Sequence, residues 1–122
     1  MEDNKITEQK EIMENEKITD LLIKVTGVNF PNLDGSSRQK ILEELYKSGG
    51  NFIISLVREP QNEYDKNAIM VLAGDRQVGY VGREESELLA PLMDANTFFE
   101  TEVWELGEYK GTYYLHILIH EV

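Results

Sequence analysis

Short apolar runs with alternating positions recur along this chain, and they predict a mainly β fold. Within residues 18–27, Leu21, Ile23 and Val25 occupy every second position, which is the spacing of one face of a strand. We expect this first strand to end near Gly27. Similar runs rich in β-branched and aromatic residues predict five more strands, at residues 51–57, 68–73, 77–82, 97–106 and 111–122.

Two segments show helical spacing instead. The first begins after Ser36 or Ser37, either of which is a suitable N-cap, and stops at Gly49-Gly50. The second spans residues 84–94, where Pro91 predicts a kinked or two-piece helix because proline lacks a backbone N–H. The resulting order is β-α-β-β-β-α-β-β. Many short strands with only two helices favour an α+β fold built on a small barrel or a strongly curved sheet.

The last two predicted strands carry two further local expectations. The glycines in residues 107–111 predict that this segment forms the turn of a hairpin. Trp104 lies in the strand before it, and we expect its large ring in the barrel core or as a cap on one end.

The composition predicts one domain behind a charged arm. Residues 1–17 are almost all polar or charged, so we expect a flexible arm there and a single domain at residues 18–122. The absence of cysteine excludes disulfides and thiolate metal sites. No apolar stretch approaches the length of a membrane span, and the N-terminus lacks a signal-peptide pattern. We therefore expect a cytoplasmic protein with no membrane partner.

The charge distribution separates two regions of the chain. The net charge is −11, of which residues 1–17 contribute −3, and such an acidic balance disfavours contacts with phosphates. Residues 84–108 contain eight acids and no base, whereas residues 58–83 contain four of each. An anionic ligand is therefore expected to approach the middle segment, and a basic protein partner the acidic 84–108 region.

The loop at residues 58–69 is the most informative segment. It connects two predicted strands, and at this length it exceeds an ordinary hairpin connection. Pro60 and the Asn- and Asp-rich tail are typical of a turn. Tyr64, Asp65 and Lys66 place an aromatic ring, an acid and a base in succession. Such polar chemistry on a loop held by two strands favours a binding site.

The loop and the following strand also resemble a known family. The resemblance is to the HIRAN domain and covers about residues 20–122, and its motif residues are Arg58-Glu59-Pro60, Asn62, Tyr64-Asp65-Lys66-Asn67-Ala68-Ile69, Val71 and Gln77-Val78-Gly79-Tyr80-Val81, with Val25-Thr26-Gly27-Val28 before them. It implies a modified OB-like β-barrel, which agrees with the strand count. It also implies a stand-alone, bacterial member of the family.

The resemblance implies a non-catalytic module that binds single-stranded DNA and captures a free 3′ end, in a DNA repair or replication context. By position, Tyr64 would stack on a base or sugar, and Asp65 would accept a hydrogen bond from the 3′-hydroxyl. A carboxylate there tolerates a hydroxyl donor and repels a continuing phosphate. The structural alternative is that Asp65 caps the loop backbone while Tyr64 packs over the barrel edge.

The chain departs from the family at two places. The DNA-binding members carry an arginine and an aromatic residue after the Gly-Val pair, where this chain has Asn29 and Phe30. Phe30 is either a stacking platform or a core residue. After Val78-Gly79, those members have a histidine and then lysines, whereas this chain has Tyr80 and, three residues later, Arg83. Arg83 and Lys66 are therefore the best candidates for phosphate contacts.

No motif for catalysis accompanies these residues. The chain lacks a phosphate-binding glycine loop and a nucleophile elbow, so we predict a binding module and no enzyme. His116 and His120 share one strand face, but no third ligand is evident, so neither a metal nor a cofactor is predicted. Two functions remain open: a DNA-end binder, or a protein-interaction or regulatory module that kept the fold and lost the basic groove.

Overall fold

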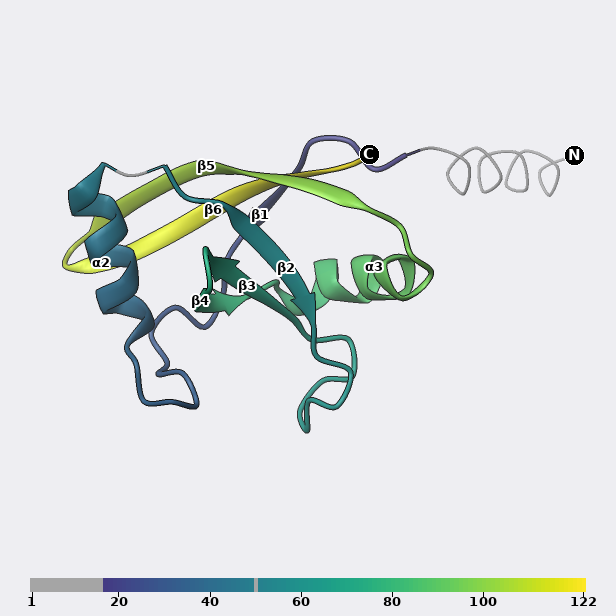
Figure 1. Ribbon diagram of the computed structural model, residues 1–122, viewed down its shortest axis with the longest axis horizontal. Helices are drawn as coiled ribbons and strands as arrows, with labels where there is room; N and C mark the ends of the chain where they lie inside the picture. The colour runs from purple at the N-terminus through teal and green to yellow at the C-terminus, as the bar shows by residue number, and fades with distance from the viewer. Residues whose placement is uncertain (1–16, 50) are drawn as a thin grey trace, which may run out of the picture.

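The computed structural model describes residues 17–49 and 51–122, which form two antiparallel three-stranded sheets and two helices (Figure 1). One sheet has the order β1-β6-β5, with β1 at Leu21–Lys24, β6 at Thr112–Glu121 and β5 at Phe99–Tyr109. The other has the order β2-β3-β4, with β2 at Ile54–Arg58, β3 at Ile69–Ala73 and β4 at Arg76–Tyr80. The predicted mainly β fold and its element order are confirmed.

Hydrogen bonds join the two sheets at two places. The backbone groups of Thr26 and Tyr80 exchange two hydrogen bonds of 2.8 and 2.9 Å, which join the chain after β1 to the end of β4. On the other side, the Thr101 hydroxyl on β5 donates to the Ile54 carbonyl on β2 at 2.7 Å. The two sheets therefore enclose one core between them.

Alternate residues of the facing strands fill that core. Ile23 of β1, Val71 of β3 and Ile117 of β6 are each 0% exposed. This is the period-two pattern expected for strands with one buried face. The buried cluster comprises Ile23, Val25, Ile41, Leu42, Ile54, Ile69, Val71, Ala73, Val78, Val81, Leu89, Ala90, Leu115, Ile117 and Ile119.

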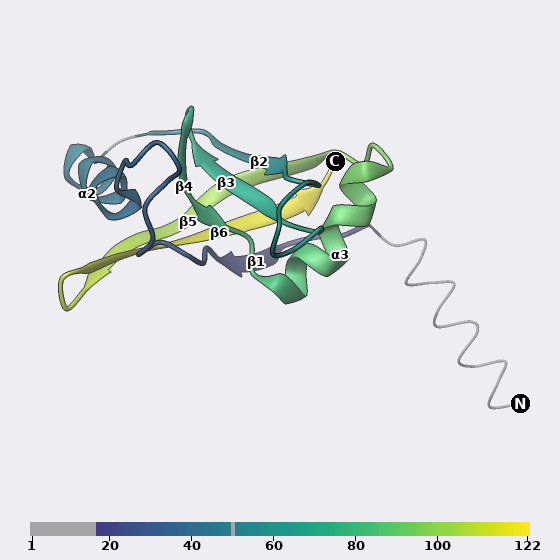
Figure 2. The ribbon, with the colours of Figure 1, turned by 90° about the horizontal axis from the view of Figure 1, so that it is seen from below.

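The helices α2 (Arg38–Ser48) and α3 (Arg83–Asp94) lie at opposite ends of the sheets (Figures 1 and 2). The Ser37 hydroxyl accepts a hydrogen bond from the Lys40 backbone N–H, as predicted for an N-cap, and Gly49 ends the helix with a left-handed φ of 60°. Of the two alternatives predicted for the second helix, the two-piece helix is wrong, because α3 continues through Pro91 to Asp94. Pro91 lies in the last turn and lacks the N–H that would donate to the Glu87 carbonyl.

The turn of the β5–β6 hairpin is shorter than the sequence indicates. Strand β5 includes Gly107, Glu108 and Tyr109, so the turn contains only Lys110 and Gly111. Both turn residues have positive φ, 51° and 84°, which is typical of a type I′ hairpin. The prediction that residues 107–111 form the turn is therefore wrong in extent.

The expected burial of Trp104 is also wrong, since its side chain is 61% exposed. Val103 faces inward, so the alternation of β5 turns Trp104 outward. A register shift between Val103 and Glu105 then keeps Glu105 on the outer face as well.

The predicted arm at residues 1–17 falls outside the described residues except for Lys17, whose ammonium donates to the Val122 carbonyl at 3.1 Å. Within residues 17–49 and 51–122, no helix is long and apolar enough to cross a membrane.

Candidate nucleic-acid interface

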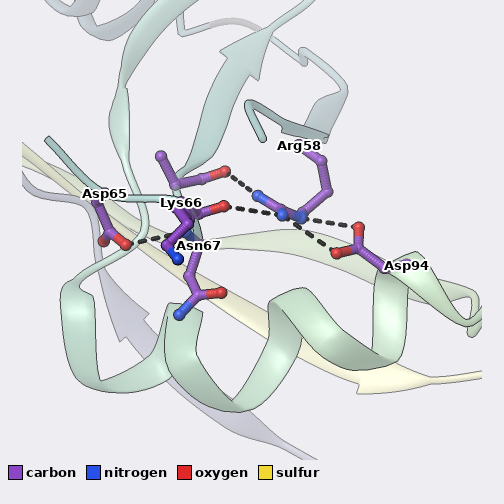
Figure 3. A network of polar contacts seen from close by, with 6 residues as sticks. Arg58, Asp65, Lys66, Asn67 and Asp94 are labelled. Atoms are coloured by element: carbon purple, nitrogen blue, oxygen red, sulfur yellow. Dashed lines mark hydrogen bonds and ion pairs between the residues drawn. The ribbon is translucent and has the colours of Figure 1, made fainter. Parts of the chain in front are cut away.

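Arg58 braces the loop at residues 59–68 against the end of α3 (Figure 3). Its guanidinium donates to the carbonyls of Ala68 and Lys66 at 2.7 and 2.9 Å. It also donates to both carboxylate oxygens of Asp94 at 2.9 and 3.1 Å. One side chain therefore connects both ends of the loop region to the helix. The loop projects from the same side of the molecule as the segment before α2 (Figure 1).

Two side chains fold the tip of this loop. The Asn62 carbonyl oxygen accepts from the backbone N–H groups of Tyr64 and Asp65 at 2.9 and 3.0 Å. Asp65 Oδ1 then accepts from the Asn67 backbone N–H at 2.9 Å (Figure 3). This is the Asx-turn expected in the structural interpretation of Asp65. It occupies one carboxylate oxygen and leaves Oδ2 facing Arg83 Nε at 3.9 Å.

Glu59 connects the loop to β4. One carboxylate oxygen accepts from the Asn62 amide at 2.7 Å and from the Tyr80 hydroxyl at 2.9 Å. Burial raises the pKa of Tyr80 above its ordinary value, and the Glu59 carboxylate adds to the shift, although a Gln77 hydrogen bond opposes it. The phenol therefore stays neutral and donates to Glu59 at physiological pH.

Arg38 lies over the Tyr80 ring, with its Cζ atom 5.4 Å from the ring centroid. It is only 7% exposed, and it donates to the Asn32 side-chain oxygen at 2.7 Å and to the Gly27 carbonyl at 2.8 Å. The Phe30 ring approaches the same place, since a Cβ atom built on Gly27 would lie 4.0 Å from it.

Arg38 is not among the site residues predicted from the sequence, although one signal points to it. Arg38 and Arg83 are the first residues of α2 and α3. A cation is unfavourable there, because the N-terminal end of a helix carries partial positive charge. Both arginines instead lie beside Tyr80 or Asp65, at the candidate site.

The predicted site residues divide into connected and unconnected side chains. Tyr80 and Asp65 belong to one hydrogen-bonded group through Glu59 and Asn62, and Arg83 faces Asp65. Three others, Tyr64, Lys66 and Asn29, are exposed, and their side chains make no hydrogen bond or ion pair with the residues that the structure describes.

Exposure separates the alternatives for the two aromatic residues. Phe30 is 68% exposed, so it is not a core residue. Tyr64 is 87% exposed, so it does not pack over the barrel edge. Both rings are free to stack on a ligand.

The two histidines of β6 pair across the hairpin with acids of β5. His120 Nε2 lies 2.8 Å from Glu100, and His116 Nδ1 lies 3.7 Å from Glu105. The described part of the chain contains no group of three or more histidine and carboxylate side chains suited to a metal ion.

Comparison with known proteins assigns the family. The model of the HIRAN domain matches residues 24–117, which includes the loop, β4 and the segment around Gly27. The chain belongs to the HIRAN family. The HIRAN domain of human HLTF has the same fold, with a TM-score of 0.57 and 26% identity over 86% of this chain and 78% of that one. A HIRAN-like fold also occurs in a Lactobacillus plantarum protein, with a TM-score of 0.64 and 24% identity over 86% of this chain and 92% of that one.

Larger proteins contain related segments. A putative SWI/SNF-related matrix-associated actin-dependent regulator of chromatin subfamily A member 3-like 1 from Arabidopsis thaliana is 46% identical over 56 residues, 43% of this chain. The mouse helicase-like transcription factor is 39% identical over 66 residues, 51% of this chain. These matches span only 6% and 7% of the relatives' own lengths. The likeness therefore concerns this domain alone.

Proposed function

We propose that this domain binds single-stranded DNA and captures a free 3′-hydroxyl end without catalysing a reaction. The observation that carries the proposal is the pairing of an 87% exposed Tyr64 with the neighbouring Asp65 on a loop fixed by side-chain hydrogen bonds. The relatedness to a helicase-like transcription factor and to a chromatin regulator agrees with a DNA partner.

The loop chemistry supports selection of an end. Tyr64 offers a ring on which a base can stack, an interaction worth about 1–3 kcal/mol with little sequence preference. Asp65 Oδ1 already accepts from the Asn67 backbone N–H. Its Oδ2 remains as an acceptor for a hydroxyl. A terminal phosphate at this position would meet the negative charge of Asp65 at short range. Arg83 softens that repulsion from 3.9 Å but is mostly exposed to water.

Fluorescence anisotropy with 5′-labelled oligothymidylates tests the proposal. We expect saturable binding of the 3′-hydroxyl oligonucleotide at low salt, and at least about tenfold weaker binding of the 3′-phosphate form, as for other charge-based discrimination. Equal binding of the two ends contradicts end capture, and so does the absence of binding to either.

Two substitutions assign the roles. Tyr64→Ala is expected to weaken the binding of both oligonucleotides about tenfold, which corresponds to the loss of one stacked base. Tyr109→Ala is the matched control, because Tyr109 is 67% exposed on the distant β5–β6 hairpin. Asp65→Asn keeps the acceptor of the Asx-turn and removes the charge, so it is expected to narrow the preference for the 3′-hydroxyl end.

A protein-interaction module is the second candidate, favoured by the edge strand β5. Its outer face carries the exposed Trp104 beside Glu102 and Glu105. An exposed aromatic residue among acids suits a basic protein segment. A domain that binds neither oligonucleotide, yet loses a partner on Trp104→Ala, would have this function instead.

A further inference from the structure

Arg38 is a buried cation without a matching acid. Its partners are neutral: the Asn32 side-chain oxygen, the Gly27 carbonyl and the face of Tyr80. No ion pair within residues 17–49 and 51–122 includes it. The nearest acid in this network, Glu59, is bonded to the hydroxyl of Tyr80. Burial of an unneutralised charge is costly, so the fold retains a positive charge that an anion would stabilise.

One nitrogen of this guanidinium is available to a ligand. Nε and Nη1 are occupied, whereas Nη2 has no hydrogen-bond partner among the described residues. No buried side-chain nitrogen or oxygen in that part of the chain lacks a partner. Nη2 is therefore in contact with solvent, although the residue as a whole is 7% exposed. Arg38 is therefore fixed through Nε and Nη1, while its Nη2 reaches solvent.

Two aromatic rings lie close to Gly27 and to the Arg38 guanidinium. A Cβ atom at Gly27 would lie 3.2 Å from Arg38 Nη1, 3.9 Å from the Tyr80 ring and 4.0 Å from the Phe30 ring. This part of the surface therefore combines a fixed cation with the exposed ring of Phe30. This is the pairing of phosphate contact and base stacking that single-stranded nucleic acid requires.

We propose that Arg38 binds a phosphodiester group of single-stranded DNA beside Gly27, while a neighbouring base stacks on Phe30. The inference rests on the proposed DNA binding and adds a second subsite, connected to the Tyr64–Asp65 loop through Tyr80 and Glu59. The 3′ end lies at the loop, and the phosphate at Arg38 belongs to an internal linkage of the same strand.

Oligonucleotides in which one phosphodiester is replaced by an uncharged methylphosphonate test the subsite on the native protein. A 5′-labelled oligothymidylate of about ten nucleotides is prepared with a single methylphosphonate at each linkage in turn. We expect one internal position to weaken binding about tenfold, the scale of one charge-assisted hydrogen bond. In Arg38→Gln, the unmodified strand is expected to bind about tenfold more weakly, and the methylphosphonate at that position to cause no further loss. If Arg38→Gln and the native protein respond alike at every linkage, the proposal is wrong.

Matched variants separate this effect from net charge and from folding. Arg76→Gln removes the same charge at the other end of β4, where Arg76 pairs with Glu44, and its affinity is expected to stay within about twofold of native. If Arg38→Gln fails to fold by circular dichroism, Arg38→Lys replaces it. Lysine cannot bond to Gly27, Asn32 and a phosphate in the same geometry, so native affinity in Arg38→Lys overturns the proposal.

The two proposals fail in different ways. Preference for a 3′-hydroxyl over a 3′-phosphate depends on Asp65 and should persist in Arg38→Gln. A native protein without that preference, but with one linkage whose effect requires Arg38, would disprove end capture and retain the subsite. A native protein that prefers the 3′-hydroxyl end, but in which no methylphosphonate weakens binding, would disprove the Arg38 subsite and retain end capture.

Discussion

Arg58 on β2 and Asp94 at the end of α3 form a bidentate ion pair, with N–O distances of 2.9 and 3.1 Å. The same guanidinium holds two carbonyls of the candidate loop. Arg58 therefore both forms an ion pair and braces the loop. The position of Tyr64 and Asp65 thus depends on a residue that lies outside the proposed contact surface.

Removing Arg58 should therefore cost more than removing its acid partner. Arg58→Ala leaves the carbonyls of Ala68 and Lys66 without their donor and should destabilise the domain by about 2–3 kcal/mol. Asp94→Ala leaves those two bonds in place and removes a half-exposed partner, so it should cost less than about 1 kcal/mol. Urea denaturation measures both. Equal losses would mean that the ion pair, and not the loop brace, dominates.

Gly79 should not tolerate a side chain. A Cβ atom there would overlap the carbonyl oxygen of Thr26, at the point where the two sheets join. Gly79→Ala is expected to destabilise the domain by about 1–3 kcal/mol, the usual range for overpacking. Gly82→Ala is the control, because its new Cβ would crowd only the flexible end of Glu85 and would contact Thr26 Cγ2 at an ordinary 3.7 Å, so it should cost less than about 1 kcal/mol. Thermal denaturation followed by circular dichroism compares the two, and similar melting temperatures would contradict this view.

Local signals in the sequence were enough for most of the fold. The cap at Ser37, the left-handed Gly49 and the alternating apolar residues of β1 each act over a few positions, so they could be read directly. The errors at Pro91 and Trp104 occur where interactions between residues distant in the sequence determine the local structure. Helix α3 continues through Pro91 just after Leu89 and Ala90 pack into the core, and the bulge near Trp104 depends on pairing with β6.

The candidate site was predictable only in part. The loop from Arg58 to Ile69 is contiguous, so its chemistry is visible in the sequence. Arg38 is not, because its neighbours Gly27 and Tyr80 are 11 and 42 positions away and meet only after the sheets close. The sequence around Asn29 therefore indicates only that a cation is missing there, and Arg38 supplies a positive charge that this segment does not reveal.

The Tyr80–Glu59 hydrogen bond should make a pH-dependent contribution to stability. Burial raises the pKa of Tyr80, so the folded state favours the neutral phenol more than the unfolded state does. This stabilisation is complete below the ordinary tyrosine pKa of about 10 and is lost as the pH rises through the folded value. Tyr80→Phe, which lacks the hydroxyl, should be about 1 kcal/mol less stable than native near pH 8 and closer to native near pH 11. Urea denaturation at the two pH values tests this, and a constant difference would exclude ionisation of Tyr80 as the cause.

Arg83 should contribute to DNA binding through its charge alone. Its side chain is 71% exposed and lies 3.9 Å from Asp65, so it is positioned for a phosphate near the strand end. For single strands, each phosphate contact adds about 0.7 to the slope of log affinity against log salt concentration. Arg83→Gln should therefore flatten this slope by about 0.7 and converge with the native protein at high salt. It should also sharpen the preference for a 3′-hydroxyl, because Asp65 loses its neighbouring cation. Arg76→Gln removes the same charge elsewhere and should leave the slope unchanged. Parallel salt dependences of Arg83→Gln and native protein would show that Arg83 does not contact the strand.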